Sequence, residues 1–381
     1  MENTIKNRII KMKIVLSAAL VMIIVLFLVL NLVTPDRTVS ERENRELAQL
    51  PKITLSSVLD GSYFHSLDSY ISDQFVFRDY WISLKSTAEI WQGRKEISNI
   101  YLGSSDYLLA KPELPNHQAV KQTITSINTF VKNHKKNKVS VMIVPNASQI
   151  LKDQLPDFAA VHNQLKDIND IKNQLKGINY LDAASILQKH KKEDIYYHTD
   201  HHWTTDGAYD VYQGVSKQLG LNNSKDHYKR YLVSDSFEGT LASQSGVHTT
   251  KDKIYVYVNS SKYQYYVNYP DQNKKSASCF EVEALKKSDQ YQVFFGGNHP
   301  LVEIRTTNHN GKNLMVFKDS YANSFIPFMI SHYEKIIMVD PRYYYDNLSS
   351  AIKDYGINEY LFLYSANTLV KDTVLKDVLN S

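Results

Sequence analysis

Short apolar runs and stretches of helical periodicity alternate along most of the chain. Runs rich in branched or aromatic side chains predict strands at 139–144, 178–181, 314–317, 336–339 and 360–364. Between them, apolar residues recur every three or four positions, which predicts helices over 117–135, 161–175, 208–219 and 324–333. Helices that separate short apolar strands are typical of a mainly parallel sheet with helices on both faces. We therefore expect an α/β domain over 116–381.

The stretch 232–295 lacks helical periodicity and predicts a β-rich insertion in that domain. Ile254–Val258 and Tyr263–Val267 are expected to form its antiparallel strands, with Lys274–Ser278 as a loop. In parallel sheets, ligand sites gather beyond the carboxyl ends of the strands. The residues that directly follow each predicted strand are therefore the first place to look for chemistry.

A long apolar run near the N-terminus predicts a membrane anchor. Ile14–Val33 contains no charged residue and, at about 1.5 Å per residue, spans roughly 30 Å, the hydrocarbon thickness of a bilayer. Four basic residues precede it, so residues 1–13 are expected to be a cytoplasmic tail and residues from 34 onward extracytoplasmic. A cleaved signal peptide is the alternative. Because no small-x-small cleavage site follows the run, we favour an uncleaved signal anchor over 14–33.

Residues 34–115 are interpreted as a membrane-proximal, mostly helical segment. It begins with the polar and charged stretch 38–50, which ends at Pro51. Helical spacing then predicts one helix within 59–81 and a second over 80–92. Residues 100–109 predict two short strands around a Gly-Ser-Ser-Asp turn.

Charge and cysteine content exclude two classes of protein. The net charge of +4 lies mostly in the first 13 residues, so the remainder is too balanced to favour nucleic-acid binding. The single Cys279 cannot form an internal disulfide, so the extracytoplasmic part must be stabilised by its core. Tyrosine is abundant, with 27 residues, and such rings suit either carbohydrate contact or surface hydrogen bonding.

The segment 196–209 concentrates candidate chemistry just ahead of a helix that Thr204 or Thr205 caps and Gly220 ends. In an extended segment or tight loop, alternate side chains share one side. This places His198, Asp200 and His202 together and His201 opposite. An aspartate that holds an imidazole in one tautomer is half of a hydrolase triad, so the pattern indicates a base in need of a nucleophile.

Ser320 is the candidate nucleophile because it directly follows the predicted strand 314–317 and precedes a helix. A serine on such a turn is exposed, and the amides of the helix that follows point toward a developing oxyanion. The ordinary alternative is a serine that caps the helix. Gly296-Gly297-Asn298 supplies a second piece, since Asn298 and Gly297 could donate into an oxyanion hole. Its ordinary alternative is a turn between strands.

Four motifs together resemble the bacterial membrane-anchored DHHW family. They are Asp200-His201-His202-Trp203, the charged segment 40–47, Asp73-Gln74-Phe75 with Arg78, and Gly296-Gly297-Asn298-His299. That family is similar to the SGNH-hydrolase-like alginate O-acetyltransferases, which carry an Asp-x-His-Trp signature and a serine further toward the C-terminus. The resemblance implies an SGNH-hydrolase-like parallel sheet with helices on both faces.

The same resemblance implies roles for individual residues. Asp200 would orient the base His202, Ser320 would be the nucleophile, and His201 and Trp203 would support them. In that fold the serine usually follows a Gly-Asp pair, whereas Lys318-Asp319 precedes it here. The implied activity is transfer or removal of an O-acyl group, foremost acetyl, on a cell-surface polysaccharide, with no metal and no cofactor. A multispanning membrane acyltransferase is the implied partner.

Two other functions compete with this interpretation. The His198–His202 cluster could bind zinc as a metal-dependent hydrolase, although ligands from adjacent residues strain tetrahedral geometry. A non-catalytic surface protein that binds glycan through its tyrosines is the other alternative. It would not require an Asp-His pair beside a candidate serine.

Overall fold

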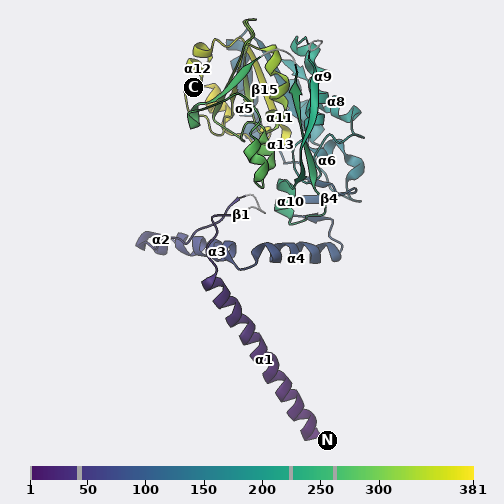
Figure 1. Cartoon of the computed structure of the whole chain (residues 1–381), viewed down its shortest axis with the longest axis vertical. Helices are drawn as coiled ribbons and strands as arrows, with labels where there is room; N and C mark the ends of the chain where they lie inside the picture. The colour runs from purple at the N-terminus through teal and green to yellow at the C-terminus, as the bar shows by residue number, and fades with distance from the viewer. Residues whose placement is uncertain (1, 41–44, 223–225, 261–263) are drawn as a thin grey trace. The chain divides into compact units, whose positions relative to one another are not determined.

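The computed structural model describes residues 2–40, 45–222, 226–260 and 264–381, and the chain forms two compact units, Met1–Gln92 and Gly93–Ser381 (Figure 1). The sequence predicts an α/β domain that begins at residue 116. The second unit begins earlier because the strands β3 (Glu96–Ile97), β4 (Ile100–Leu102) and β5 (Leu108–Ala110) pack on α10 (Thr240–Ser245) through a shared apolar cluster. These strands form the predicted hairpin around residues 103–107.

The first unit contains a long apolar helix and three shorter ones. They are α1 (Glu2–Val33), α2 (Leu55–Leu59), α3 (Ser62–Gln74) and α4 (Arg78–Trp91), with the small hairpin of β1 (Val39–Ser40) and β2 (Arg45–Glu46). By length and composition, Ile5–Val33 is apolar enough to cross a membrane, and it contains the predicted span 14–33. The predicted helices 59–81 and 80–92 correspond to α3 and α4. Helix α3 ends where Phe75 adopts an extended ψ of 129°, and Phe77, with a φ of 58°, directly precedes α4.

A mixed sheet forms the centre of the second unit. Its strands are β6 (Lys138–Val144), β7 (Asn179–Leu181), β10 (Tyr265–Tyr269), β11 (Lys274–Ser276), β12 (Leu301–Thr306), β13 (Asn313–Lys318), β14 (Lys335–Val339) and β15 (Glu359–Ser365). Their order is β11-β10-β12-β14-β13-β15-β6-β7. The strands from β14 to β7 run parallel, and β12, β10 and β11 extend the sheet by antiparallel pairing.

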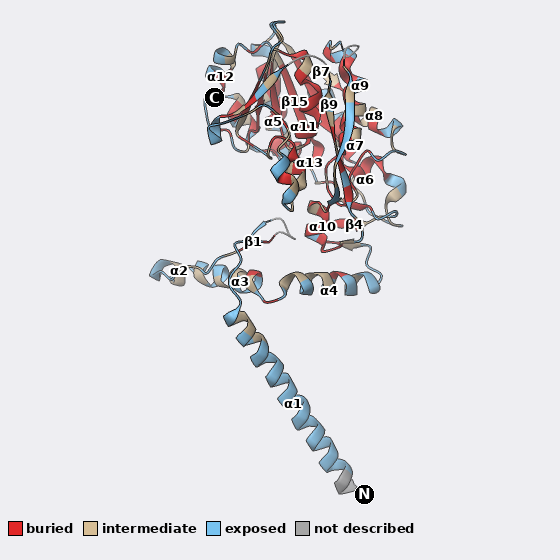
Figure 2. Cartoon of the chain, in the orientation of Figure 1, coloured by how far each residue is buried: buried red, intermediate tan, exposed pale blue. Residues whose placement is uncertain are grey.

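Alternation along the strands divides the core between the two faces of the sheet. In β6, Val141 and Ile143 join one apolar cluster while Met142 and Val144 join the other, because neighbouring side chains point to opposite faces. The first face is covered by α5 (His117–Asn133), α7 (Gln164–Gln174), α12 (Leu348–Tyr355), α13 (Ala366–Leu369) and α14 (Leu375–Leu379). The second is covered by α6 (Ala147–Ile150), α8 (Ala183–Lys189), α9 (Thr205–Leu219) and α11 (Tyr321–Phe325). The buried strands stand out in Figure 2, and the predicted α/β fold with helices on both faces is confirmed.

Three local predictions differ from the structure. The β-rich insertion is split: β8 (Tyr228–Phe237) pairs with β9 (Asp252–Asn259) as a separate hairpin, whereas β10 joins the central sheet. The predicted loop Lys274–Ser278 is wrong over 274–276, which form the edge strand β11. The predicted helix 324–333 is instead α11 followed by two short 3-10 helices, because Pro327 cannot donate a helical hydrogen bond. Tyr263, the predicted start of one strand, lies outside the described residues.

Candidate active site

The site lies at the carboxyl edge of the parallel strands. Lys318, the last residue of β13, pairs with Leu363 of β15, and Ser365 of β15 pairs with Val144 of β6, so the three strands end together. The main chain of Asp319 and Ser320 therefore leaves the sheet at this edge, as expected for a site in a parallel α/β fold.

Ser320, His202 and Asp200 form a continuous hydrogen-bonded chain. Ser320 Oγ lies 2.7 Å from His202 Nε2, and His202 Nδ1 lies 2.5 Å from Asp200 Oδ1. His202 and Asp200 are buried, and Ser320 is half-buried at the surface of the unit. Ser320 stands at the start of α11 but makes no side-chain capping bond, so its hydroxyl serves the histidine rather than the helix. The structure thus brings together the three residues that the sequence singled out as a triad.

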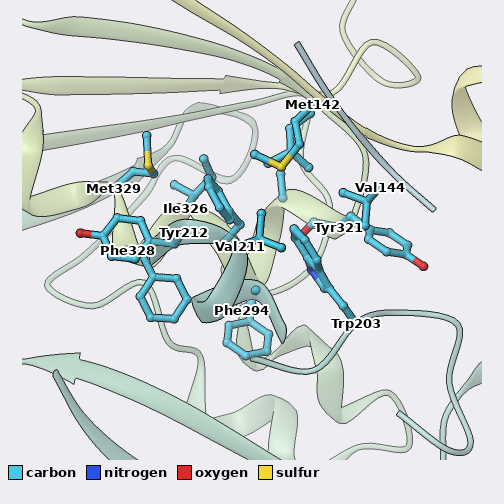
Figure 3. Close-up of a cluster of buried hydrophobic side chains, with 14 of the residues drawn as sticks. Met142, Val144, Trp203, Val211, Tyr212, Phe294, Tyr321, Ile326, Phe328 and Met329 are labelled. Atoms are coloured by element: carbon cyan, nitrogen blue, oxygen red, sulfur yellow. The ribbon is translucent and has the colours of Figure 1, made fainter. Parts of the chain in front are cut away.

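The loop that carries Asp200 and His202 is a tight turn. Tyr196 pairs with Trp203, and the Tyr197 amide donates to the His202 carbonyl across 3.3 Å, which closes a narrow hairpin. Trp203 anchors one end: its indole N–H donates to the Tyr321 carbonyl across 3.0 Å. Figure 3 shows the Trp203 ring in the buried apolar cluster near Val211 and Tyr321.

This turn changes the predicted arrangement of the histidines. His198 does not join Asp200 and His202: its ring stacks on Tyr107 at 3.8 Å, and its Nδ1 lies 3.3 Å from Asp252 Oδ1. His201, expected on the opposite side, lies with its ring centroid 3.9 Å from that of His202. The reversal occurs because a tight turn does not keep the strict alternation of an extended strand.

Asp200 is held by a loop that the sequence analysis did not identify. Its Oδ2 accepts hydrogen bonds from the Thr240 amide at 2.8 Å and the Thr240 hydroxyl at 3.0 Å. Gly239 packs directly on the carboxylate, since a Cβ there would lie 2.2 Å from the Asp200 Cβ. Burial alone would raise the pKa of Asp200, but the imidazoles of His201 and His202 and the bonded hydrogens lower it far below its usual range. The carboxylate is therefore charged.

The Thr240 hydroxyl also fixes the tautomer of His201. It has one proton, which it donates to the charged Asp200, so it can only accept from His201 Nδ1 at 2.6 Å. His201 therefore carries its proton on Nδ1. Removal of the ring from bulk water, although it stays partly exposed, and the neighbouring His202 lower the pKa of His201 to about 4. Neutral His201 consequently presents an unprotonated Nε2 beside the triad.

Tyr291 forms one wall of the site. Its ring stacks on the His202 imidazole, with centroids 3.9 Å apart and an angle of 9° between the planes. Its hydroxyl donates to the Ser320 carbonyl at 3.2 Å and lies 3.1 Å from Ser324 Oγ. Burial raises the pKa of Tyr291 well above its ordinary value, so the phenol stays neutral. No local sequence pattern marks Tyr291, Thr240 or Gly239, because their roles depend on contacts between distant segments.

The oxyanion-hole candidates are linked to the Ser320 turn through Lys318. Asn298 is exposed, and its Oδ1 accepts from Lys318 Nζ at 2.9 Å and from Asn323 Nδ2 at 3.3 Å. Asn323 also donates to the Gly297 carbonyl at 3.2 Å. Because an ammonium group only donates, Asn298 must turn its oxygen toward Lys318, which leaves Nδ2 on the other branch as a donor. Lys318 thus occupies the place of the expected glycine and has a structural partner there.

The backbone donor closest to the nucleophile is its own amide. The Tyr321 amide is already used, since it donates to Asp319 Oδ1 at 3.0 Å. Asp319 Oδ2 accepts from the Ser365 amide at 2.9 Å, which ties the turn to β15. This leaves the Ser320 amide, rather than the following helix, as the backbone candidate for an oxyanion.

Two groups of side chains among the described residues could hold a metal ion. The first is Asp200, His201 and His202, and the second is His190, Glu193 and Asp210, each with ligand atoms within 4.8 Å of one another. In the first group, both imidazole nitrogens of His202 and both oxygens of Asp200 already have hydrogen-bond partners. A metal there would have to replace the triad hydrogen bonds, so the geometry fits proton transfer better than metal binding.

Comparisons with known proteins place this chain in a family. Residues 115–339 match the DHHW protein family. A DHHW family protein from Eubacterium siraeum is similar in structure, with a TM-score of 0.63, 23% identity, and coverage of 75% of this chain and 96% of that one. Bacillus cereus PatB1, solved with a sulfonyl adduct, has a TM-score of 0.60, 21% identity, and coverage of 72% and 96%. A search of curated protein sequences found no significant relative. Because the family match spans more than half of its residues, the chain belongs to the DHHW family.

Proposed function

We propose that this protein is a membrane-anchored, extracytoplasmic O-acyltransferase or esterase that acts on a cell-surface polysaccharide through Ser320. One observation carries the proposal: the unbroken hydrogen-bonded chain from Ser320 Oγ through His202 to Asp200. A half-buried serine, a buried imidazole and a buried carboxylate in this order are the parts that nucleophilic acyl transfer requires.

The proposed reaction has two half-reactions. Ser320 Oγ attacks the acyl carbonyl while His202 Nε2 takes the hydroxyl proton, and Asp200 stabilises the imidazolium that forms. The tetrahedral intermediate collapses as His202 returns the proton to the leaving oxygen, which leaves an acyl ester on Ser320. A sugar hydroxyl or water, deprotonated by His202, then attacks this ester and takes the acyl group, and the proton returns to Ser320.

Two donors are proposed for the oxyanion of the intermediate. The Ser320 amide is free of the turn contacts that occupy the Tyr321 amide. The Nδ2 group of Asn298 is the second, because Lys318 and Asn323 hold the other branch of that side chain. The Gly297 amide, the other candidate from the sequence, is not available, because it already donates to the Phe294 carbonyl at 3.2 Å.

The substrate and partner rest on the family resemblance alone. A polysaccharide acceptor and a multispanning membrane acyltransferase that supplies the acyl group are both proposed on that ground. The apolar helix α1 is compatible with either an anchor or a signal sequence, and we propose the anchor.

Trapping the acyl-enzyme tests the proposal. The full-length protein in detergent is incubated with a small acetyl ester, and intact mass should show a gain of one acetyl group on Ser320. A sulfonyl fluoride is a useful second probe, because PatB1 was solved with a sulfonyl adduct. Ser320→Ala should abolish both adducts, and Ser236→Ala, at an exposed serine of β8, is the matched control. Equal labelling of wild type and Ser320→Ala would rule out the serine mechanism.

A metal-dependent hydrolase remains the second candidate, because Asp200, His201 and His202 lie close enough to share an ion. Under the serine mechanism, exhaustive chelation should leave turnover and melting temperature unchanged. A large loss on chelation that zinc restores would favour the metal mechanism instead.

A further inference from the structure

Helices α3 and α4 of the first unit expose most of their large apolar side chains, unlike helices that pack in a water-soluble protein. Within them, the buried residues are Asp73 in α3 and Ser86 in α4, at 8% and 3% exposure. Their large apolar side chains are exposed instead, at 60% for Phe64, 58% for Leu84 and 87% for Trp91. Water-soluble helices bury the apolar face, so this distribution fits a surface whose neighbour is not water.

Polar residues at the end of α3 and the start of α4 are held by the chain itself. Asp73 accepts two hydrogen bonds from the Arg45 guanidinium, at 2.8 and 2.5 Å, and one from the Ala48 amide at 2.8 Å. Gln74 Nε2 donates to the carbonyls of Arg37 and Ala48. On α4, Asp79 forms an ion pair with Arg37 at 2.9 Å. The segment that follows α1 therefore packs on the polar side and leaves the apolar side open.

The exposed apolar residues form one stripe on each helix. Spacing of three and four positions puts Phe64, half-buried Leu67 and Ile71 on one face of α3, and Trp81, Leu84, Ala88 and Trp91 on one face of α4. The exposed Phe75 and Phe77, in the turn between the helices, lie at the junction of the two rows. Both helices are amphipathic, and the exposed charged residues Asp68 and Lys85 flank these stripes, four positions after Phe64 and Trp81. We call the two rows together the apolar stripe.

The apolar stripe runs directly into helix α1. The Phe75 ring stacks on Phe27 of α1 with centroids 5.9 Å apart, and the Trp81 ring lies 5.8 Å from the same ring. Between them, the Val76 amide donates to Asn31 Oδ1 at 2.9 Å. Phe27 lies six residues before the end of α1, about 9 Å along a helix, and interfacial helices rest roughly 5–10 Å into the boundary between headgroups and acyl chains.

We propose that α3 and α4 are interfacial helices whose apolar stripe lies in the extracytoplasmic leaflet of the membrane that α1 crosses. The partner is the lipid itself, because the stripe continues the apolar surface of the spanning helix. The inference rests on the proposed membrane anchor. It makes α1 a part of a folded unit, joined through Phe27 and Asn31, rather than a removable leader.

Tryptophan fluorescence tests this inference with little alteration of the protein. The chain has three tryptophans, of which Trp81 and Trp91 lie in the apolar stripe and Trp203 is fully buried in the second unit. Full-length protein is reconstituted into phosphatidylcholine vesicles with or without brominated acyl chains, and flotation verifies that it is membrane-bound. Brominated lipid should quench the Trp81 and Trp91 emission and leave Trp203, while aqueous iodide should quench neither stripe residue.

Two conservative variants show which tryptophan the lipid-dependent quenching comes from. Trp81→Phe and Trp91→Phe keep an apolar ring, and each should remove part of the lipid-dependent quenching while the double variant removes all of it. Membrane-bound protein whose Trp91 is quenched by iodide but not by brominated lipid would overturn the inference. Protection from iodide only in native membranes would also overturn it, in favour of a protein partner. Loss of acyl-enzyme with lipid quenching intact would instead count against the catalytic proposal alone.

Discussion

At the scale of single residues, the site is organised around the charge of Asp200. Its two oxygens take hydrogen bonds from the His202 ring and from the amide and hydroxyl of Thr240. Gly239 leaves no space for a side chain beside it. The orientation of His202 toward Ser320 therefore depends on a loop far from the triad in sequence. Groups held in this way act as one unit, which has measurable consequences.

The triad should show strong non-additivity. Ser320→Ala is expected to lower kcat for acyl transfer by about 10⁴-fold or more, and adding His202→Ala should cost almost nothing further. Asp200→Asn should keep the fold but reduce kcat, because the amide favours the wrong imidazole tautomer. His201→Ala should lower kcat less than any of the three triad substitutions. Steady-state kinetics with a chromogenic ester measures kcat of each variant, and His309→Ala, at an exposed position, is the control. Independent, additive losses of kcat would contradict a triad.

Asp200 should also make stability depend on pH. Its pKa in the folded protein is lower than the unfolded value of 3.8, so the unfolded chain takes up the proton first as pH falls. The stabilisation is complete above about pH 4 and is lost as pH drops toward the folded pKa. The gap in free energy of unfolding between wild type and Asp200→Asn should therefore narrow in acid. Urea denaturation across pH 2–7 measures it, and Ser320→Ala, which keeps the carboxylate, should follow wild type; a constant gap would contradict the assignment.

At the scale of elements, two turns meet at the edge of the sheet. The turn before β12 carries Asn298, and the turn after β13 carries Ser320. Buried Lys318 joins them: burial lowers its pKa to about 8, while Asp340 at 3.5 Å favours the charged form. Arg342 also holds Asp340, with bonds of 2.8 and 2.6 Å. Lys318 can therefore be replaced without leaving Asp340 unpaired.

Lys318 should act on catalysis through Asn298. Lys318→Met is expected to lower kcat by about 10²-fold with little change in KM, because the Asn298 amide loses its fixed orientation. Asn298→Ala should have a similar effect, and the double variant should be no worse than either single one. Lys353→Met, on the exposed side of α12, is the control. A double variant with fully additive losses would show that the two residues act separately.

At the scale of the whole molecule, the chain combines a helical unit that begins with a long apolar helix and a separate α/β unit. If α1 crosses a membrane as proposed, the basic residues ahead of its apolar part favour a cytoplasmic N-terminus. The surface of the second unit is charged and mixed, and its core is divided between two faces of one sheet. This organisation is consistent with the proposed membrane-anchored acyltransferase.

The topology should be visible in intact cells. Protease added outside is expected to digest residues 34–381 and to leave the short tail of residues 1–13 untouched. An epitope at the N-terminus should be cleaved only after permeabilisation, which serves as the control. Protection of the C-terminal unit in intact cells would contradict an extracytoplasmic location.

The sequence by itself determined the features that depend on local pattern. Alternating apolar strands and helical periodicity predicted the parallel sheet, the apolar run predicted the long apolar helix α1, and the serine after β13 marked the edge of the site. Each follows from side-chain periodicity or from the position of a residue at a strand end, which are properties of neighbouring residues.

Only the tertiary structure decided which side chains meet. The turn that closes at Tyr196 and Trp203 brings His201 beside His202 and directs His198 to Asp252. Long-range contacts bring Thr240 to Asp200 and place Lys318 beneath Asn298. The sequence likewise does not show that α3 and α4 leave their apolar residues exposed. That depends on the segment after α1, which packs on part of their polar side. Periodicity shows which residues share a face of one element, whereas the partner of that face is set by how distant segments pack together.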